Sequence, residues 1–177
     1  MDTHAAFAWL GSWFRQCLLQ RAPQDDPLSY RGLLGALASY TLVDLIQART
    51  TSDWGQSLAL SFMDTLLMTV FCALVLLIVQ KQARFVQTLT ALAGTSAVLG
   101  LLAMPLMLQA SRLPEDQAPS AALLMGGLTL LIWTVAVQAH IFRHALSSWY
   151  GVGLLVAGLH SALAIALVNY LLFGITH

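Results

Sequence analysis

The chain has 177 residues, of which 58% are hydrophobic and only 9% are charged. A soluble globular domain carries about 25% charged residues, so this composition excludes a water-soluble fold and indicates an integral membrane protein. Eight basic residues balance eight acidic ones, which excludes the basic face that nucleic-acid binding requires. The two cysteines, Cys17 and Cys72, provide neither a disulfide framework nor a CxxC metal or redox motif.

The first segment, residues 4–21, is predicted to form an amphipathic helix. Helical spacing gives it an apolar stripe made of Ala6, Leu10, Trp13, Phe14, Cys17 and Leu18. Ser12, Arg15 and Gln16 lie opposite this stripe. Because tryptophan and arginine occur together, we expect the helix to lie in the membrane interface, with packing against the bundle or a partner as the alternative. A signal peptide is disfavoured because Arg15 interrupts the apolar run.

A polar, proline-bounded break at residues 22–27 separates this helix from the rest of the chain. The chain therefore divides into residues 1–28, an interfacial helix with its linker, and residues 29–177, a membrane domain. Five apolar segments follow in this domain, at 32–47, 57–79, 85–108, 121–141 and 152–173. About 20 helical residues cross a hydrocarbon core of about 30 Å. The predicted fold is all-α, a five-helix transmembrane bundle with an N-terminal interfacial amphipathic helix.

The first of the five segments is the weakest, since it is the shortest and includes Tyr40 and Asp44. Several segments carry stripes of small residues that allow a close approach of helices. Gly32, Gly35 and Ala36 form such a stripe in the first segment. The turn between the last two segments supplies Arg143, with Trp149 and Tyr150 as expected interface anchors.

The distribution of basic residues predicts the orientation. If all five segments span and the N-terminus is cytoplasmic, six of the eight basic residues lie in cytoplasmic segments, namely Arg15, Arg21, Arg31, Lys81, Arg84 and Arg143. Only Arg49 and Arg112 lie in outer loops, as the positive-inside rule requires. If the first segment did not insert, only three basic residues would be inside and five outside. The charges therefore favour insertion of the weakest segment and a C-terminus on the outer side.

Polar residues inside the spans are the candidate site. Asp44 follows Tyr40 by one turn, so the two side chains share a face and could form a hydrogen bond. Asp64 and Ser61 share a face of the second segment, and both carboxylates lie in the outer half of the membrane, where we expect them to be neighbours. Asn169 lies at a comparable depth, and His160 lies nearer the midplane as a second buried polar residue.

Two interpretations of this set remain open. Carboxylates are costly in hydrocarbon, so Tyr40, Asp44, Ser61, Asp64 and Asn169 are candidates for a polar site or a proton relay. Alternatively, the acids form only structural hydrogen bonds within the bundle near its outer interface, where the cost is lower.

No metal, cofactor or catalytic motif is predicted. His140 and His144 share a helical face, but Arg143 between them repels a cation and no acid accompanies them. Haem ligation is disfavoured because His160 lies about 15 Å deeper than His140 by helical rise. The chain contains no nucleophile elbow, P-loop or zinc-protease helix.

Residues 83–106, with the sequence ARFVQTLTALAGTSAVLGLLAMPL, resemble the corresponding hairpin of the Yip (Ypt-interacting protein) family. A basic turn leads into an aromatic and glutamine-containing run and then a small-residue helix, here Arg84, Phe85, Gln87, Thr88, Leu89, Gly94 and Ser96. The tyrosine and proline that often follow this run are absent, with Ala93 and Gly94 where the tyrosine is expected and Pro105 coming later. The resemblance, to the bacterial branch of the family, implies a non-enzymatic membrane organiser. The expected location is the bacterial inner membrane.

Two functional hypotheses follow. In the first, the protein is non-enzymatic and organises or binds other membrane proteins or lipids, with the bilayer and other membrane proteins or further copies of itself as partners. In the second, it is a small transporter or ion-coupled subunit that works through Asp44 and Asp64. The second would require an oligomer, because five helices are few for a self-sufficient transporter.

Overall fold

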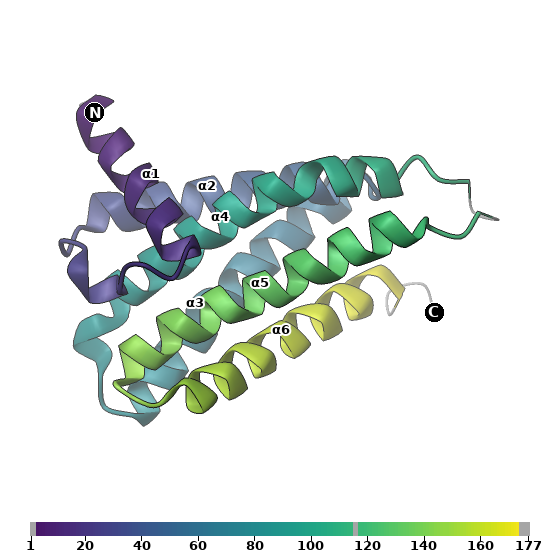
Figure 1. Cartoon of the computed structure of the whole chain (residues 1–177). Helices are drawn as coiled ribbons and strands as arrows, with labels where there is room; N and C mark the ends of the chain where they lie inside the picture. The colour runs from purple at the N-terminus through teal and green to yellow at the C-terminus, as the bar shows by residue number, and fades with distance from the viewer. Residues whose placement is uncertain (1–2, 115–116, 174–177) are drawn as a thin grey trace.

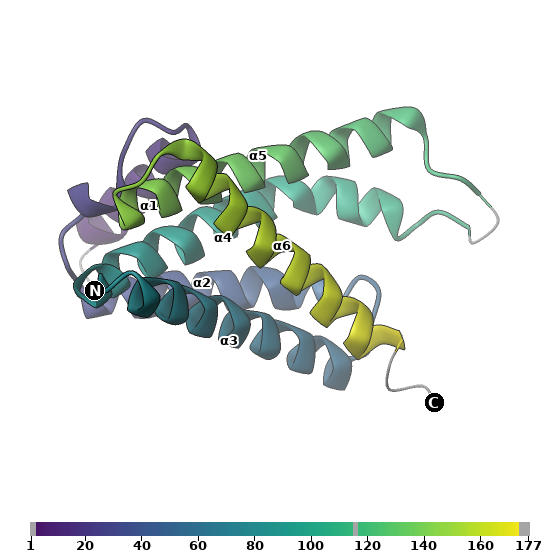
Figure 2. The ribbon, with the colours of Figure 1, turned by 90° about the horizontal axis from the view of Figure 1, so that it is seen from below.

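The computed structural model describes residues 3–114 and 117–173, and within these ranges all regular secondary structure is helical, which confirms the predicted all-α class. The six helices are α1 (Thr3–Cys17), α2 (Tyr30–Ala48), α3 (Trp54–Ile78), α4 (Phe85–Ala110), α5 (Ala121–Leu146) and α6 (Tyr150–Phe173). Two short 3-10 turns, η1 (Pro23–Asp25) and η2 (Gln82–Arg84), lie between them. Helices α2 to α6 run along one long axis and reverse direction in succession, while α1 crosses α4 at one end (Figures 1 and 2).

Four of these helices, α3 to α6, are long and apolar enough to cross a membrane, which fits a multi-pass membrane protein. The sequence predicted five such spans, and the helix that falls short is α2. It has 19 residues, but Arg31, Tyr40, Asp44 and Gln47 lower its hydropathy. It nevertheless packs along both α3 and α4 as a full member of the bundle.

Side chains at the helix ends explain where the helices begin and stop. Ser29, Asp53 and Ser120 are the N-caps of α2, α3 and α5, and each accepts a hydrogen bond from the backbone amide three residues later. The carboxyl end of α5 is capped by two cations from the preceding hairpin. Lys81 donates to the carbonyl of Leu146 at 2.5 Å, and Arg84 donates to the last carbonyls of the helix. These cations offset the partial negative charge at the end of α5.

Helix α1 differs from its predicted pattern. Trp13 and Cys17 of the apolar stripe are buried against α4, but Ser12 and Gln16, which were expected on a polar face, are buried as well. Leu10, Phe14 and Leu18 of the same stripe are exposed. The predicted division of the faces is therefore wrong. The side chain of Ala6 lies outside the described residues.

Asp26 is the physical reason for this difference. The linker after α1 forms the η1 turn (Pro23–Asp25), and Asp26 directly after it contacts α1 through its carboxylate. This carboxylate accepts hydrogen bonds from the Ser12 hydroxyl at 2.6 Å and the Gln16 amide at 2.7 Å. It also forms an ion pair with Arg21 at 3.1 Å. Buried polar groups are tolerated when they are paired in this way, so α1 can turn a polar strip inward.

Two glycines of the small-residue stripes make room for the tryptophans of α1. A Cβ atom at Gly94 would lie 2.4 Å from the indole of Trp13, and one at Gly32 would lie 2.7 Å from Trp9. These distances are far below van der Waals contact, so neither position accepts a larger side chain without moving α1. The indole of Trp133 in α5 also donates to the carbonyl of Cys17 at 2.8 Å. Helix α1 is therefore docked on the bundle.

Replacing Asp26 with alanine is expected to release α1, because Ser12, Gln16 and Arg21 then lose their shared acceptor. Removing one partner of a buried polar cluster costs about 3 kcal/mol. Cys17 reports this release, since burial raises the pKa of its thiol to about 11, above the ordinary value of 9.0, and keeps it protonated. In a Cys72→Ala background, Asp26→Ala should speed maleimide labelling of Cys17 at pH 7 by at least about tenfold.

The matched control is Asp25→Ala, because Asp25 is the exposed neighbour of Asp26 and takes no part in the buried cluster. Its labelling rate should stay close to that of the parent protein. In the parent, labelling should also remain slow up to about pH 9, where an exposed thiol is half ionised. Equal rates in the two variants would contradict the anchoring role of Asp26.

Candidate functional site

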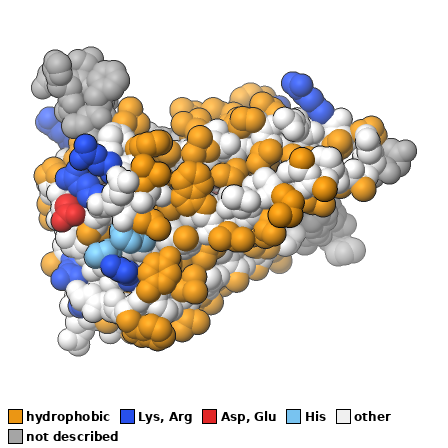
Figure 3. Space-filling view, viewed as in Figure 1, with side chains coloured by type: hydrophobic (Ala, Val, Ile, Leu, Met, Phe, Trp, Pro, Cys, Tyr) orange, Lys and Arg blue, Asp and Glu red, His pale blue; other side chains and the backbone are white. Residues whose placement is uncertain are grey.

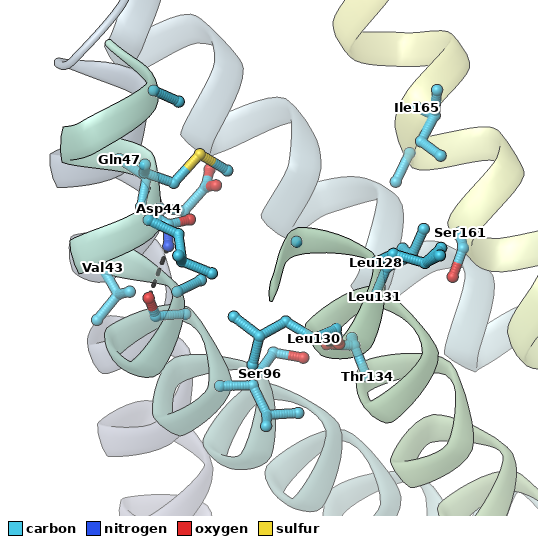
Figure 4. A pocket seen from close by; sticks show the side chains of 18 of the residues that line it. Val43, Asp44, Gln47, Ser96, Leu128, Leu130, Leu131, Thr134, Ser161 and Ile165 are labelled. Carbon is cyan, nitrogen blue, oxygen red and sulfur yellow. Dashed lines mark hydrogen bonds between the residues drawn. The ribbon is translucent and has the colours of Figure 1, made fainter. Parts of the chain in front are cut away.

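A cavity of about 720 Å³ lies between α2, α4, α5 and α6. It is located toward the end of the bundle where α4 ends and α5 begins, away from α1. In Figure 4, Val43, Asp44 and Gln47 of α2 lie on one side, Ser161 and Ile165 of α6 lie on the other, and α5 lies between them. Its volume is within the range of about 300–1,000 Å³ that is typical of small-molecule sites.

Most of the cavity wall is aliphatic. The apolar lining side chains come from four helices and include Val43, Leu99, Ala103, Leu106, Met107, Leu123, Leu124, Leu128, Leu131 and Ile165. The polar groups are few, and the ionisable ones are Tyr40, Asp44, Asp64 and His160. An apolar wall with a small number of polar groups is the usual composition of a ligand site.

The structure brings together four residues of the predicted polar site at the contact between α2 and α3. The Tyr40 hydroxyl donates a hydrogen bond to the Asp64 carboxylate, rather than to Asp44 on its own helix. Asp44 lies within electrostatic range of Asp64 and beside Ser61. The hydroxyl of Ser61 donates to the carbonyl of Ser57 at 2.9 Å. The two carboxylates are therefore neighbours, as their depths along the two helices predicted.

A second polar pair faces the same cavity from α5 and α6. His160 is only 5% exposed, and its Nδ1 atom lies 3.2 Å from the Oε1 atom of Gln138. The Phe71 ring packs on the imidazole at a centroid distance of 5.1 Å. The Nε2 atom of His160 is buried and has no hydrogen-bond partner in the described part of the chain. This nitrogen is an unused hydrogen-bonding group in the wall of the cavity.

His160 was predicted from the sequence as a buried polar residue, whereas Gln138 was not. Helices α5 and α6 are antiparallel and joined by a tight turn near Ser147 and Ser148. Residues at similar distances before and after such a turn face each other, and Gln138 and His160 lie ten and twelve residues from Ser148. Counting outward from the turn would therefore have identified the pair.

Asn169 does not join the cluster. Its side chain is exposed and does not line the cavity. Asn169 follows His160 by nine residues, which is about two and a half helical turns. An α-helix with His160 facing inward therefore has Asn169 facing outward. The matching depth of Asn169 was a poor guide, because depth does not determine the face of a helix.

His140 and His144 pack on each other with ring centroids 4.6 Å apart. The Nε2 atom of His140 lies 3.3 Å from the carbonyl oxygen of Arg21, in the linker after α1. Among the residues that the structure describes, no three His, Cys, Asp or Glu side chains are grouped closely enough to hold a metal ion.

The chemistry that this arrangement allows is binding and proton exchange. The lining has two carboxylates, one imidazole and one phenol, and among its described residues it has no Lys or Arg to neutralise the acids. Together these side chains can donate and accept hydrogen bonds, hold a proton or attract a cation.

No family model matches the chain, and no curated protein or solved structure matches it significantly. The class of the protein, a helical multi-pass membrane protein, therefore rests on its four strongly apolar helices and on the bundle that they form.

Replacing Tyr40 with phenylalanine should destabilise the contact between α2 and α3, because the Asp64 carboxylate loses its donor. We expect a loss of about 0.5–1.5 kcal/mol in unfolding free energy, because a hydrogen bond between membrane helices contributes about 0.6 kcal/mol on average and at most about 1.7 kcal/mol. Combined with Asp64→Asn, the losses should be less than additive by about 1 kcal/mol, measured by SDS denaturation in mixed micelles. Tyr170→Phe is the control, since Tyr170 is exposed on α6. Additive losses would contradict the pairing.

Proposed function

We propose that the protein is a non-enzymatic, multi-pass protein of the bacterial inner membrane that holds a hydrophobic molecule of lipid size between its helices. The observation that carries this proposal is the cavity of about 720 Å³, with its aliphatic wall and its polar groups gathered near Tyr40, Asp44, Asp64 and His160. A molecule with an apolar body and a hydrogen-bonding head matches this distribution of side chains.

The proposed topology has five spans, with α2 as the fifth. At 19 residues, α2 has a length of about 28 Å, close to the thickness of the hydrocarbon core. Two of its polar side chains bond inside the bundle: Tyr40 donates to Asp64, and Gln47 donates to the carbonyl of Gly100 at 2.7 Å. Its outward side chains include Leu34, Leu42 and Ile46, which are exposed. A helix that bonds polar side chains of its middle and outer turns inside the bundle can span despite its lower hydropathy.

The proposed orientation has a cytoplasmic N-terminus and a periplasmic C-terminus. Its support is the excess of Lys and Arg at the end of the bundle that holds α1 (Figure 3). With this orientation α1 lies at the cytoplasmic interface, where Leu10, Phe14 and Leu18 on its outer face would contact lipid.

The resemblance to the Yip family supports the same class of function. It favours a protein that binds or organises other membrane components, through lipids, other membrane proteins or further copies of itself, over a membrane enzyme. The cavity adds a candidate place where a lipid would be held.

Filling the cavity tests the proposal. Gly127 lines the cavity, and a Cβ atom there would meet nothing within 4 Å. A Gly127→Leu variant should therefore fold while its side chain occupies ligand space. We expect the amount of co-purified hydrophobic molecule, measured by native mass spectrometry after release from detergent, to fall by at least about tenfold.

Gly158→Leu is the matched control. Gly158 lies on α6, is exposed, has equally open space around it, and does not line the cavity. This variant should retain the bound molecule at the level of the parent protein. If both variants retain it equally, or if the parent carries no bound molecule in native membrane extracts, the proposal is wrong.

The meeting of Asp44 and Asp64 at the cavity favours ion-coupled transport as a second candidate function. An Asp44→Asn/Asp64→Asn double variant should then abolish uptake of the lipophilic cation tetraphenylphosphonium, and the accompanying proton movement, in proteoliposomes. Thermal unfolding should remain cooperative, because asparagine preserves the size of each side chain. Unchanged uptake in the double variant, or no uptake by the parent protein, would exclude ion-coupled transport through these two residues.

A further inference from the structure

A second pocket, of about 400 Å³, lies at the opposite end of the bundle from the cavity. It forms where η1, the start of α4 and the turn between α5 and α6 meet. The residues that matter here are Arg84, Arg143, His144, Ser148, Trp149 and Tyr150. Among the described residues that line it, none is Asp or Glu. In Figure 3 most of the blue Lys and Arg side chains, and the pale blue His side chains, gather at this end.

Arg143 supplies the largest set of available donors. Its guanidinium lies over the Tyr150 ring, with its central carbon 5.9 Å from the ring centroid. Within residues 3–114 and 117–173, Arg143 forms no hydrogen bond and no ion pair through its side chain. A guanidinium has five N–H donors in a planar fork that fits two oxygens of a phosphate.

Arg84 offsets the negative charge at the end of α5 that would otherwise repel an anion. The last carbonyls of a helix carry partial negative charge and would repel a phosphate. The Nη1 atom of Arg84 donates to the carbonyls of His144 and Ala145, each at 3.0 Å. Lys81 donates to the carbonyl of Leu146 from the other side. The end of α5 is therefore covered by two cations.

Ser148 provides a second, independent group that is able to bind a ligand. Its hydroxyl is buried and has no hydrogen-bond partner in the described part of the chain. Ser147, just before it, has left-handed backbone angles, with φ 48° and ψ 47°, which form the tight turn. An unpaired buried hydroxyl is costly unless a ligand or water completes it. Asp25 on η1 is an acid within electrostatic range of His144, but it is exposed and does not line the pocket.

We propose that this pocket binds the phosphate of an anionic phospholipid headgroup. The pocket lies between the ends of two helices that are apolar enough to span, so it opens at the level of the lipid headgroups. Trp149 is 73% exposed and Tyr150 is 37% exposed, and aromatic residues of this kind occur at the membrane interface. Basic pockets between membrane helices bind the headgroups of acidic lipids. The proposal is independent of the cavity ligand, because the two sites share no lining residue.

The experiment compares lipid binding by native mass spectrometry, with the full-length protein and phosphatidylglycerol or phosphatidylcholine of identical acyl chains. The parent protein should bind phosphatidylglycerol at least about tenfold more tightly than phosphatidylcholine. Arg143→Gln should reduce this preference by at least about fivefold, and Arg143→Lys should restore only part of it, because lysine lacks the planar fork. Arg15→Gln is the control, since Arg15 is an exposed arginine on α1, near the same end of the bundle.

Inorganic phosphate at millimolar concentration separates a lipid site from a site for free phosphate. We expect it to leave the bound phosphatidylglycerol in place, because the acyl chains contribute to binding and free phosphate lacks them. Displacement by inorganic phosphate, the same preference in Arg143→Gln as in the parent, or an equal loss in Arg15→Gln would each overturn the proposal. Cooperative thermal unfolding of Arg143→Gln with the midpoint of the parent confirms that the variant folds.

Discussion

The cost of an unpaired polar group in hydrocarbon is the constraint on which this bundle depends. Helix α2 shows it most clearly, because its composition alone falls short of that of a membrane span. Tyr40 and Gln47 form hydrogen bonds to α3 and α4, so these two side chains are satisfied only when α2 packs against both helices. Such bonds contribute little each in membranes, about 0.6 kcal/mol on average. They nevertheless determine which face of α2 turns inward and thus the position of Asp44.

The same rule governs the end of the bundle that carries α1. The Asp26 carboxylate is buried because three donors surround it, and two cations cover the exposed carbonyls at the end of α5. Packing follows from these polar contacts, since the tryptophans of α1 then lie over Gly32 and Gly94. Small residues in membrane helices commonly allow the approach of another helix backbone. In this protein, Gly32 and Gly94 instead make room for the indole rings of α1.

Hydropathy and depth along the chain predicted much of this structure. The helices begin and end close to the expected boundaries, and Asp44 and Asp64 meet because both lie in the same half of antiparallel helices. The predictions that were wrong concern which face of a helix points into the bundle. Periodicity identified two faces on α1 but could not show that Asp26, ten residues beyond Gln16, would attract the polar one. Likewise Asn169 has a suitable depth but points away from His160, and Gln138 became visible only through the geometry of the hairpin.

The two candidate sites carry opposite charges, and their separation limits what each can hold. The cavity presents Asp44 and Asp64, and its described lining lacks Lys and Arg, whereas the pocket at the other end presents Arg84 and Arg143. Water and salt screen charges poorly inside a bundle, so an acidic headgroup is repelled from the cavity and attracted to the pocket. If both proposed sites bind lipids, acidic phospholipids are expected at the rim, and the cavity is left to molecules with a neutral or basic head.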